Sequence, residues 1–431
     1  MSPAPLRDPR ARHLVFGLLI LALIAGLGLT PVVARLDALS VDLLLPARQW
    51  LPGPGSEAAT ATAAADTHPV VVVAVDEATY ATPPFAGTPK VLWTPQLAKV
   101  QDAIIAAGAS VFAYDILFPT SAEPFLPGHE RPFLQSLRQG AAQGKIVLGK
   151  VQHGEQPLLP HRVQQLMVRG GANIRSLNVP VDRDDVIRQL PLMFATATGD
   201  AEPAMALEIA VRHLGVPAEA APDGGVQLGD WAVPGAARSA THIGFRPDTI
   251  PTYSFADLFA CAEAGDSAYF ARHFAGRAVL FGGVLDIEDR KLTSFRFAAE
   301  NHPGLAMPGC QTSDPPPPET RRDTMPGVYI HAAAARDLIL QTPLVQLPKT
   351  TALGLVLLAA ALATLISLRT RAVRGLLGIL LLGALTTGSA VAATGAQLLA
   401  PLVPALAAIA LAYLLALVYR YAILDRQARH I

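Results

Sequence analysis

The segment Val-Val-Val-Val-Ala-Val-Asp-Glu, residues 70–77, decides the fold class of this chain. Its first six residues are apolar and mostly β-branched, and they lack the alternation of a strand with one exposed face. Such a run is typical of a strand that lies inside a parallel sheet and is buried on both faces. Because parallel strands need long crossover connections, usually helices, the segment predicts an α/β fold.

A second strand follows after one helix. Residues Gln96–Ala107 have helical spacing and end at Gly108, a residue suited to the end of a helix. Ser110–Tyr114 is again a short apolar run, and it ends at Asp115. This order of strand, helix and strand is a βαβ unit, so we expect the two strands to be parallel and adjacent in the sheet.

The same patterns continue along the central part of the chain. They predict helices over Arg131–Ala142, Pro203–Leu214 and Tyr329–Leu340, and strands over Lys145–Val151 and Arg277–Phe281. The sequence therefore predicts an α/β domain with a mostly parallel, mixed sheet over residues 35–348.

Two segments of this domain have the composition of connections. Pro52–Thr67 is rich in Pro, Gly, Ala and Thr and predicts a linker. Residues 298–324 contain four consecutive prolines, Pro315–Pro318, and little periodicity. Since a proline-rich stretch favours neither sheet nor helix, we interpret residues 298–324 as a loop insertion.

Four apolar runs flank the domain, at residues 14–34, 351–368, 375–396 and 398–419. A membrane helix needs about 17–25 such residues to cross roughly 30 Å of hydrocarbon. The mean hydropathy of +0.36 and the charged fraction of 16% agree with a membrane protein. The first run is longer than the apolar core of a signal peptide, which predicts an uncleaved anchor rather than a removed leader. Helical spacing over Arg35–Leu45 indicates that the first span continues into the domain.

The positions of the basic residues predict the orientation of the spans. Arginines precede the first run, separate the second from the third and follow the fourth: Arg7, Arg10, Arg12, Arg369, Arg371, Arg374, Arg420, Arg426 and Arg429. By the positive-inside rule, residues 1–13 and 420–431 are cytoplasmic and the large domain lies outside. The net charge is zero, which argues against a nucleic-acid partner.

The two cysteines, Cys261 and Cys310, fall in the predicted outer domain, where a disulfide is permitted. A bridge would close a loop of about 50 residues, which the chain-entropy model values at roughly 4 kcal/mol. The alternative is one buried thiol and one exposed thiol. The spacing does not decide between them.

Acidic side chains follow several predicted strands: Asp76, Glu77, Asp115, Asp286, Glu288 and Asp289. If the strands are parallel neighbours, these acids converge at the carboxyl edge of the sheet, where α/β folds bind ligands. Such a cluster suits Ca²⁺, Mg²⁺ or a cationic ligand. The alternative is that the acids cap the helices that follow and shape turns.

Two further positions have both a functional and a structural interpretation. His331 lies on the helix that follows Met325-Pro-Gly-Val and could titrate near neutral pH as a sensor, or join helix to sheet as a buried packing residue. Gly282-Gly283 after a strand could let the backbone approach an anion, or form a tight turn.

Five segments in order resemble the CHASE2 extracytoplasmic sensor domain of bacterial transmembrane receptors. They are VVVVAVDE (70–77), GASVFAYDILF (108–118), VDRDDVIRQLPL (181–192), FAGRAVLFGGVLDIED (274–289) and MPGVYIHAAAARDL (325–338). One span before the domain and three after it also resemble that family. Residues 298–324 are longer than the family's connection, and Asp286, Glu288 and Asp289 stand where the family has a Gly-x-Gly-Asp pattern.

The resemblance implies a multi-pass protein of the bacterial inner membrane with a periplasmic sensor domain for a small ligand. Family members usually continue into a cyclase or kinase, whereas this sequence ends at Ile431. We therefore expect either an effector beyond this chain or a separate effector protein. The alternative function is a structural or assembly subunit that docks an envelope protein through residues 298–324 and the linker before Val70.

No catalytic motif is present: G-x-S-x-G, the P-loop and H-E-x-x-H are all missing from the sequence. We therefore expect neither enzymatic activity nor a cofactor. The third and fourth apolar runs carry many small residues, including Gly375, Gly378, Gly383, Gly388 and Gly395. Small residues let membrane helices approach closely, which favours packing within a bundle or a dimer; the alternative is a loose fit to lipid. The resemblance to receptors that often act as dimers implies a homo-oligomer.

Overall fold

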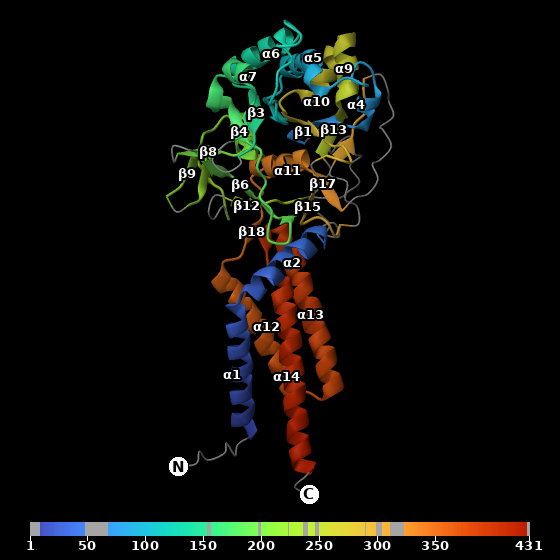
Figure 1. Ribbon diagram of the computed structural model, residues 1–431. Helices are drawn as coiled ribbons and strands as arrows, with labels where there is room; N and C mark the ends of the chain where they lie inside the picture. Colours follow the sequence, from blue (N-terminus) through green and yellow to red (C-terminus); the bar gives the residue numbers. More distant parts are fainter. Residues whose placement is uncertain are drawn as a thin grey trace. The chain divides into compact units, whose positions relative to one another are not determined.

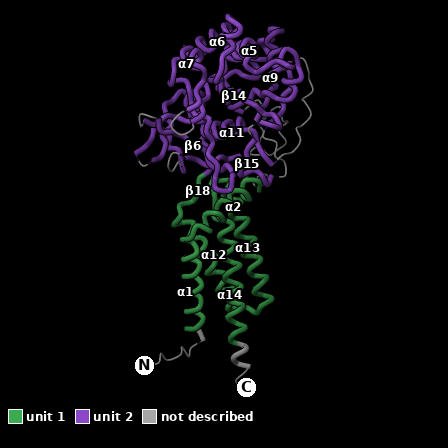
Figure 2. The backbone as a smooth tube through the Cα atoms, viewed as in Figure 1, with its two compact units in different colours: residues 1–51, 345–431 green, residues 52–344 purple. Residues whose placement is uncertain are grey.

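The computed structural model describes residues 9–47, 68–152, 157–196, 200–222, 224–235, 240–245, 250–288, 290–298, 304–310 and 323–428. The chain divides into two compact units, residues 1–51 with 345–431 and residues 52–344, which Figure 2 distinguishes by colour. The predicted linker over Pro52–Thr67, Asp289 and most of residues 298–324 lie outside the described residues.

The unit of residues 52–344 is built on a seven-stranded sheet of order β16-β13-β1-β14-β2-β3-β4. All of its neighbouring strands pair in parallel. The strands are β1 (Val70–Val75), β2 (Val111–Asp115), β3 (Ile146–Lys150), β4 (Ile174–Ser176), β13 (Ile250–Ser254), β14 (Ala278–Gly283) and β16 (Gly304–Ala306). The predicted α/β class is therefore confirmed, with a central sheet that is parallel throughout.

The order of the strands corrects one prediction. β1 and β2 are parallel but not adjacent, because β14 lies between them, with Leu280 opposite Val72 on one side and Ala113 on the other. β14 is an apolar strand that is buried along nearly its whole length, so a central position removes more of its surface from water than an edge would. The helix between β1 and β2 therefore crosses over two strand positions.

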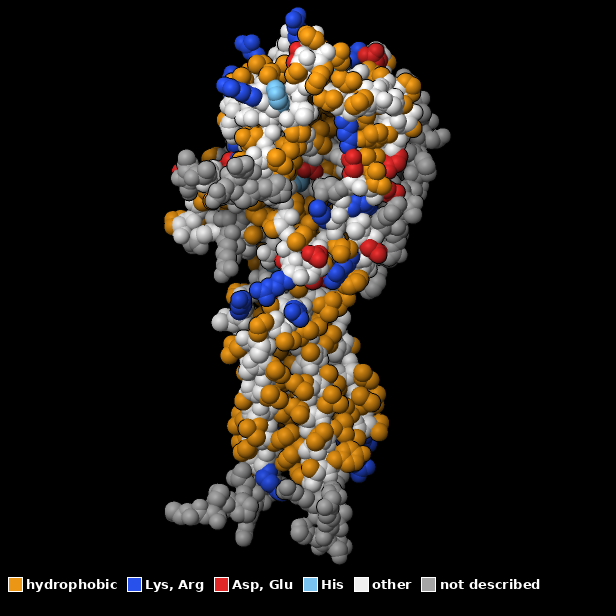
Figure 3. Space-filling model, in the orientation of Figure 1, with side chains coloured by type: hydrophobic (Ala, Val, Ile, Leu, Met, Phe, Trp, Pro, Cys, Tyr) orange, Lys and Arg blue, Asp and Glu red, His pale blue; other side chains and the backbone are white. Residues whose placement is uncertain are grey.

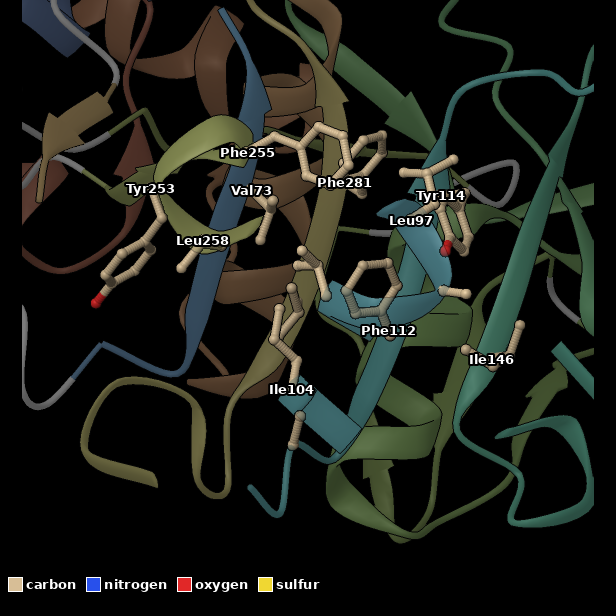
Figure 4. Close-up of a cluster of buried hydrophobic side chains, with 14 of the residues drawn as sticks. Val73, Leu97, Ile104, Phe112, Tyr114, Ile146, Tyr253, Phe255, Leu258 and Phe281 are labelled. Atoms are coloured by element: carbon tan, nitrogen blue, oxygen red, sulfur yellow. The ribbon is translucent and has the colours of Figure 1, made fainter. Parts of the chain in front are cut away.

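Helices cover both faces of the sheet (Figure 1). On one face lie α5 (Thr94–Ala106), α6 (Arg131–Ala142), α9 (Phe255–Ala264) and α10 (Ser267–Phe274), whose apolar residues join those of the strands in one core cluster. Figure 4 shows part of this cluster, including Phe112, Tyr114, Phe255 and Phe281. On the other face, α8 (Met205–Leu214) and α11 (Gly327–Ile339) pack on β1, β2 and β14.

Shorter elements complete this unit. The helical segments are α4 (Glu77–Ala81), η2 (Lys90–Leu92), α7 (Arg162–Met167) and η3 (Gly170–Asn173). Small sheets join β5 (Val186–Ile187), β15 (Arg290–Thr293) and β17 (Thr324–Pro326); β6 (Gln189–Pro191) and β12 (Ala240–His242); β7 (Met193–Ala195) and β8 (Ala201–Pro203); and β9 (Ala218–Ala220), β10 (Val226–Leu228) and β11 (Trp231–Ala232).

Part of the predicted loop insertion is a strand. Residues Gly304–Ala306 form β16 at the edge of the central sheet and pair with β13. Pro303 and Pro308 flank these three residues, and an edge position tolerates nearby prolines because only one side of the strand donates hydrogen bonds. Just beyond β16, Cys310 forms a disulfide with Cys261 of α9, with 5.7 Å between their Cα atoms.

The second unit consists of long helices: α1 (Pro9–Gly28), α2 (Pro31–Ala47), α12 (Lys349–Arg369), α13 (Ala372–Gly395) and α14 (Leu402–Ala428), with a short pairing of β18 (Val345–Gln346) and β19 (Leu398–Leu399). Among the described residues, four helices are long and apolar enough to cross a membrane: Ala11–Gly28, Lys349–Arg369, Ala372–Gly395 and Leu402–Ile423. Apolar side chains cover their outer surface in Figure 3. The chain is a multi-pass membrane protein.

The segment expected to continue the first span is instead a separate helix. α1 ends at Gly28, and Thr30 closes a turn by donating from its hydroxyl to the carbonyl of Leu27. Pro31 then begins α2, a position that proline favours because its missing N–H is not needed there. Ser40 of α2 accepts a hydrogen bond from the backbone N–H of Val403 at the start of α14, which ties the two helices together.

Small residues lie at the contacts between the apolar helices, and buried alanines are prominent among them in the described residues. Buried alanines of α12 and α14 pack against each other: Ala359, Ala360 and Ala363 with Ala405, Ala408 and Ala412. Of the predicted glycines, Gly378 approaches Ile366 closely, whereas Gly388 and Gly395 of α13 have open space where a Cβ would lie. Arg420 of α14 donates to the carbonyls of Ser367 and Thr370 and so satisfies the free end of α12.

Candidate ligand-binding site

A cavity of about 730 Å³ lies at the carboxyl ends of the central strands. The strand ends that line it are Val75 of β1, Asp115 of β2, and Phe281 and Gly283 of β14. This is the edge at which open α/β sheets bind ligands, and the volume is within the range of sites for small molecules.

Helices and loops form the remaining walls. The start of α5 contributes Trp93, Thr94 and Leu97; α11 contributes Gly327, Val328 and His331; other lining residues are Lys90, Val91, Ile116, Leu117, Phe118, Pro119, Thr120, Glu130, Val151, Gln164, Leu177, Asn178, Val179, Glu288 and Lys291. Thirteen of the 25 lining residues are apolar or aromatic, and ten are polar or charged. The cavity thus has a mixed lining, with room for a small molecule that carries both apolar and polar groups.

Asp115 and His331 are two of the predicted residues that line the cavity. His331 is 1% exposed, and its Nε2 lies 3.8 Å from Oδ1 of Asp115 and 3.3 Å from the carbonyl oxygen of Leu177. The side chain therefore joins α11 to the ends of β2 and β4 while also facing the cavity. The contacts fit the interpretation of His331 as a buried residue that joins helix to sheet, and its role as a sensor stays a prediction.

Glu288 is the third predicted residue at the cavity. Both of its carboxylate oxygens accept hydrogen bonds from Nζ of Lys90, at 2.8 and 2.7 Å. The two side chains are about half exposed, so water screens this ion pair. The pair nevertheless places a cation and an anion together on the cavity wall.

The other predicted acids have local structural roles. Asp76 caps α4 by accepting from the backbone N–H of Thr79 at 2.8 Å, and it also accepts from the hydroxyl of Ser254. Glu77 accepts from the backbone N–H of Asp286 at 3.0 Å, and the Asp286 carboxylate lies 3.7 Å from Arg290. These three acids do not line the cavity. Within the described ranges, no group of three or more His, Cys, Asp or Glu side chains is placed to hold a metal ion.

Gly282 and Gly283, expected after the strand, are the last two residues of β14 and pair with Ala74 and Val75 of β1. A Cβ at Gly282 would lie 2.7 Å from Cβ of Val328, so this glycine allows α11 to approach the sheet closely. Its neighbour Gly283 lines the cavity. Neither glycine has the left-handed backbone that a tight turn after the strand would favour.

Glu130 is a cavity residue that the sequence did not reveal. It is fully buried, and its carboxylate accepts from the hydroxyl of Ser121 at 2.7 Å and from the backbone N–H of Ala122 at 2.8 Å. These bonds fold the loop after β2 back onto the start of α6. No strand or motif precedes Glu130, so no local pattern indicates its burial.

Two buried polar atoms of the cavity wall also went unnoticed in the sequence. Oγ1 of Thr94 and Nε2 of Gln164 have no hydrogen-bond partner within the part of the chain that the structure describes. Thr94 is 2% exposed and Gln164 is 0% exposed. Buried polar groups normally have partners, but atoms of this kind also occur away from the cavity, so these two do not by themselves mark a binding site.

The segment VDRDDVIR, which contributed to the family resemblance, is a turn held by an arginine. Arg188 is almost fully buried and donates to Asp182 at 2.7 Å and to Asp184 at 2.7 and 2.9 Å. Its hydrogen bonds lower the pKa of Asp184 to about 2. Nearby, burial lowers the pKa of His242 to about 4, so this histidine is neutral at physiological pH. The segment lies outside the cavity and has a structural role.

The end of α11 is fixed by a second buried set of charges. Arg336 and Asp337 are 1% and 2% exposed, and they pair at 2.9 Å. Arg336 donates to the carbonyl of Gly244 at 2.6 Å, while Asp337 accepts from the N–H of the same residue at 2.7 Å. One end of α11 therefore lines the cavity, and the other clamps the segment after β12.

The family model of the CHASE2 domain matches residues 16–366 of this chain. The match covers more than half of the sequence and includes every residue that lines the cavity. No curated protein and no solved structure matches the chain.

Proposed function

The chain belongs to the CHASE2 domain family, a family of sensory domains, and on this premise we propose that the cavity binds the cue that the protein senses. In this proposal the protein is a receptor module of the bacterial inner membrane. Its α/β unit lies in the periplasm, both termini lie in the cytoplasm, and the output is an effector outside these 431 residues. The module itself is proposed to be non-catalytic.

One observation carries the proposal: α11 forms part of the cavity wall and leads directly to the membrane helices. Gly327, Val328 and His331 line the cavity at its first turns. All thirteen residues of the helix are buried, so a displacement at its cavity end acts on packed neighbours along its whole length. Its chain continues through residues 340–348 to α12, which begins at Lys349.

A ligand in this cavity could therefore shift the position of α11 and, through the connecting residues, the start of α12. Such a ligand changes the equilibrium between two states only by its difference in affinity for them. The tight contact between Gly282 and Val328 makes this helix sensitive to small changes at the sheet edge. This relay is the mechanism that we propose.

Hydrogen exchange on the full-length protein in lipid nanodiscs tests the proposal. The low-molecular-weight fraction of a bacterial periplasmic extract is expected to protect peptides that line the cavity and to change exchange in residues 340–348. Val179→Trp, which fills the cavity from a half-buried wall position, should abolish both responses. Val181→Trp is the matched control, because Val181 is 48% exposed and does not line the cavity.

Two results would contradict sensing through this site. One is an unchanged exchange pattern in the wild-type protein after addition of the extract. The other is a response that survives in Val179→Trp. Alkaline phosphatase fusions after residues 340 and 431 test the orientation separately, and activity is expected only for the first, since that enzyme folds in the oxidising periplasm.

The alternative is a structural or assembly subunit, and exposed apolar side chains favour it. Phe125 is 85% exposed and Ile287 is 90% exposed. Its proposed docking segments, residues 298–324 and the linker before Val70, lie mostly outside the described residues. Purification from native membranes in mild detergent, followed by mass spectrometry, separates the two functions. A cyclase or kinase as partner supports the receptor, and a stable envelope complex without one supports the subunit; the same preparation reports the proposed homo-oligomer.

A further inference from the structure

The turn between α12 and α13 carries a cluster of arginines, and we propose that this cluster binds the phosphate groups of anionic membrane lipids. Its members are Arg369, Arg371, Arg374 and Arg420. All four belong to the unit of the long apolar helices, so this lipid site is independent of any ligand in the cavity of the α/β unit.

The cluster forms because the connection between the two helices is short. α12 ends at Arg369 and α13 begins at Ala372, and Arg374 lies in the first turn of α13. Arg420 of α14 reaches the same place, since its guanidinium donates to the carbonyl of Ser367 at 3.1 Å and to that of Thr370. Three helices therefore bring four positive charges to one turn.

The bundle itself offers this cluster no counter-charge. Lys349 and the four arginines are the only charged residues of the segment 345–423. Among the described side chains of this unit, the acids are Asp37 and Asp42, both of α2. Asp37 interacts with Lys349 at the start of α12, and the 21 residues of that helix place Lys349 about 30 Å from Arg369. Physiological salt screens charges beyond about 8 Å, so the acids of α2 do not neutralise the turn.

Three of the four arginines are available to an external anion. The side chains of Arg369, Arg371 and Arg374 are exposed, and they make no hydrogen bond or ion pair within the part of the chain that the structure describes. Arg420 is half-buried and is already bound to the end of α12. Because like charges repel one another, an anion that binds the three exposed guanidinium groups stabilises the turn.

The surroundings of the turn favour a lipid as the source of that anion. Exposed apolar side chains flank it on both helices: Leu362 and Leu365 on α12, and Val373, Leu376 and Leu377 on α13. Basic side chains and this apolar surface occur together at one end of the bundle in Figure 3. Both helices are long and apolar enough to cross a membrane, so their ends lie near the headgroups.

A phospholipid matches both parts of this surface. Its acyl chains contact the exposed leucines, and its phosphate oxygens accept from the arginines, whose planar forks bind phosphate with two hydrogen bonds. A soluble phosphate would use the arginines alone. Clusters of basic residues directly beside a membrane helix are a known means of attracting anionic lipids.

Native mass spectrometry of the full-length protein, delipidated in mild detergent, tests the proposal. The probes are phosphatidylglycerol, zwitterionic phosphatidylcholine with the same acyl chains, and soluble glycerol 3-phosphate. Phosphatidylglycerol is expected to bind about tenfold more tightly than phosphatidylcholine. Glycerol 3-phosphate at the same concentration is expected not to displace it, and displacement would overturn the assignment to a lipid.

Variants locate the binding. Arg371→Gln with Arg374→Gln should weaken phosphatidylglycerol binding at least about tenfold, because each basic residue near an anionic lipid contributes roughly fivefold. Arg371→Lys with Arg374→Lys keeps the charges that orient the spans and loses only the forked geometry, so it should weaken binding a few-fold. The matched control is Arg35→Gln with Lys349→Gln, which removes two exposed charges away from the turn and should bind like the wild type. Circular dichroism confirms that each variant is folded.

Three results would overturn the proposal. The first is equal binding of phosphatidylglycerol and phosphatidylcholine by the wild type. The second is unchanged phosphatidylglycerol binding in the folded glutamine variant of Arg371 and Arg374. The third is an equal loss in the control variant, which would show a response to total charge rather than to this turn. An acidic protein that is lost from the glutamine variant while lipid binding persists would assign the cluster to a protein partner instead.

Discussion

The two faces of the central sheet are packed in different ways. On the face covered by α5, α6, α9 and α10, large rings such as Phe112, Tyr114 and Phe281 fill the space, and the disulfide from Cys261 tethers the edge. On the other face, α11 is buried along its whole length and approaches the sheet over Gly282, where an added Cβ would meet Val328. The first face depends on apolar volume, and the second on close approach and a buried set of polar contacts.

This difference in packing is the reason why we expect α11, rather than a helix of the opposite face, to respond to a ligand. Aromatic side chains interlock over a broad surface, and moving one helix there would open voids. α11 instead approaches the sheet closely over Gly282, and specific polar contacts hold its two ends, His331 near Asp115 and Arg336 with Asp337 on Gly244. A ligand that changes the contacts of His331 would therefore act on one of the two ends that fix the helix. Four changes test the comparison.

Arg336→Ala should have the largest effect, because it leaves Asp337 charged and buried without its partner. Removing one member of a buried pair typically costs about 3–5 kcal/mol. Urea denaturation followed by intrinsic tryptophan fluorescence, to which buried Trp93 contributes, measures the loss. Lys99→Ala is the control, since its exposed pair with Glu263 contributes less than about 1 kcal/mol. Equal effects of the two substitutions would contradict the role of the clamp.

Removal of the disulfide should have the second-largest effect on stability. It acts on the face of the sheet that α5, α6, α9 and α10 cover. Cys261 and Cys310 are 49 residues apart, and the chain-entropy model assigns such a bridge about 4 kcal/mol, with measured values often nearer 2–3 kcal/mol. The Cys261→Ala, Cys310→Ala double variant is expected to show this loss in the same denaturation experiment. Wild-type protein with reductant should match the variant, and an unchanged midpoint under reductant would contradict the bridge.

Gly282→Ala tests the close approach of α11 directly. The new Cβ would meet Val328 at 2.7 Å, so the helix must shift, and overpacking of this kind costs about 1–3 kcal/mol. Gly171→Ala is the matched control, because nothing lies within 4 Å of its Cβ position. If both variants denature at the wild-type urea concentration, α11 is not held closely to the sheet.

The free energy of unfolding should depend on pH through the titration of His242. This residue ends β12, two residues before Gly244, which Arg336 and Asp337 hold. Burial lowers its pKa from 6.5 to about 4, although nearby Asp182 opposes this shift. The unfolded state therefore binds more protons between pH 6.5 and 4, and stability falls as pH falls through this window. At 1.36 kcal/mol per pKa unit, the loss between pH 7 and 5 is about 1–2 kcal/mol.

His242→Gln should remove that part of the pH dependence. Asp184, whose pKa is about 2, contributes stability that is present above its ordinary pKa of 3.8 and is lost only as pH falls towards 2. The two groups therefore titrate in separate windows. A variant whose stability declines between pH 7 and 5 as steeply as that of the wild type would show that His242 is not the group responsible.

Much of the fold could be predicted, because the signals for elements are local. The valine run of β1, the helix ending at Gly108 and the apolar β14 were all found where the patterns placed them. The adjacency of β1 and β2 was wrong because it was inferred from chain order alone. β14 begins 163 residues after β2 ends, and no local pattern indicates that it inserts between the two.

The site could be predicted only in part. Asp115, Glu288 and His331 line the cavity, whereas Asp76, Glu77 and Asp286 follow strands in the same way yet bond to Thr79, to Ser254 and to one another. A residue at a strand end can turn towards the cavity or towards a neighbouring loop or strand, and sequence position does not distinguish the two. Glu130, Thr94 and Gln164 belong to helix starts or interiors far apart in the chain, so only folding brings them to one wall.

Local patterns in the sequence were enough to predict an α/β domain that is flanked along the chain by apolar helices. Burial on both faces of a strand and the length of a membrane span are both properties of short segments. The order of the strands, the close approach of α11 over Gly282 and the two buried donors of the cavity were decided by the tertiary structure alone. Each of these depends on pairs of residues distant in the chain, and whether a polar atom finds a partner is settled only when the whole domain has packed.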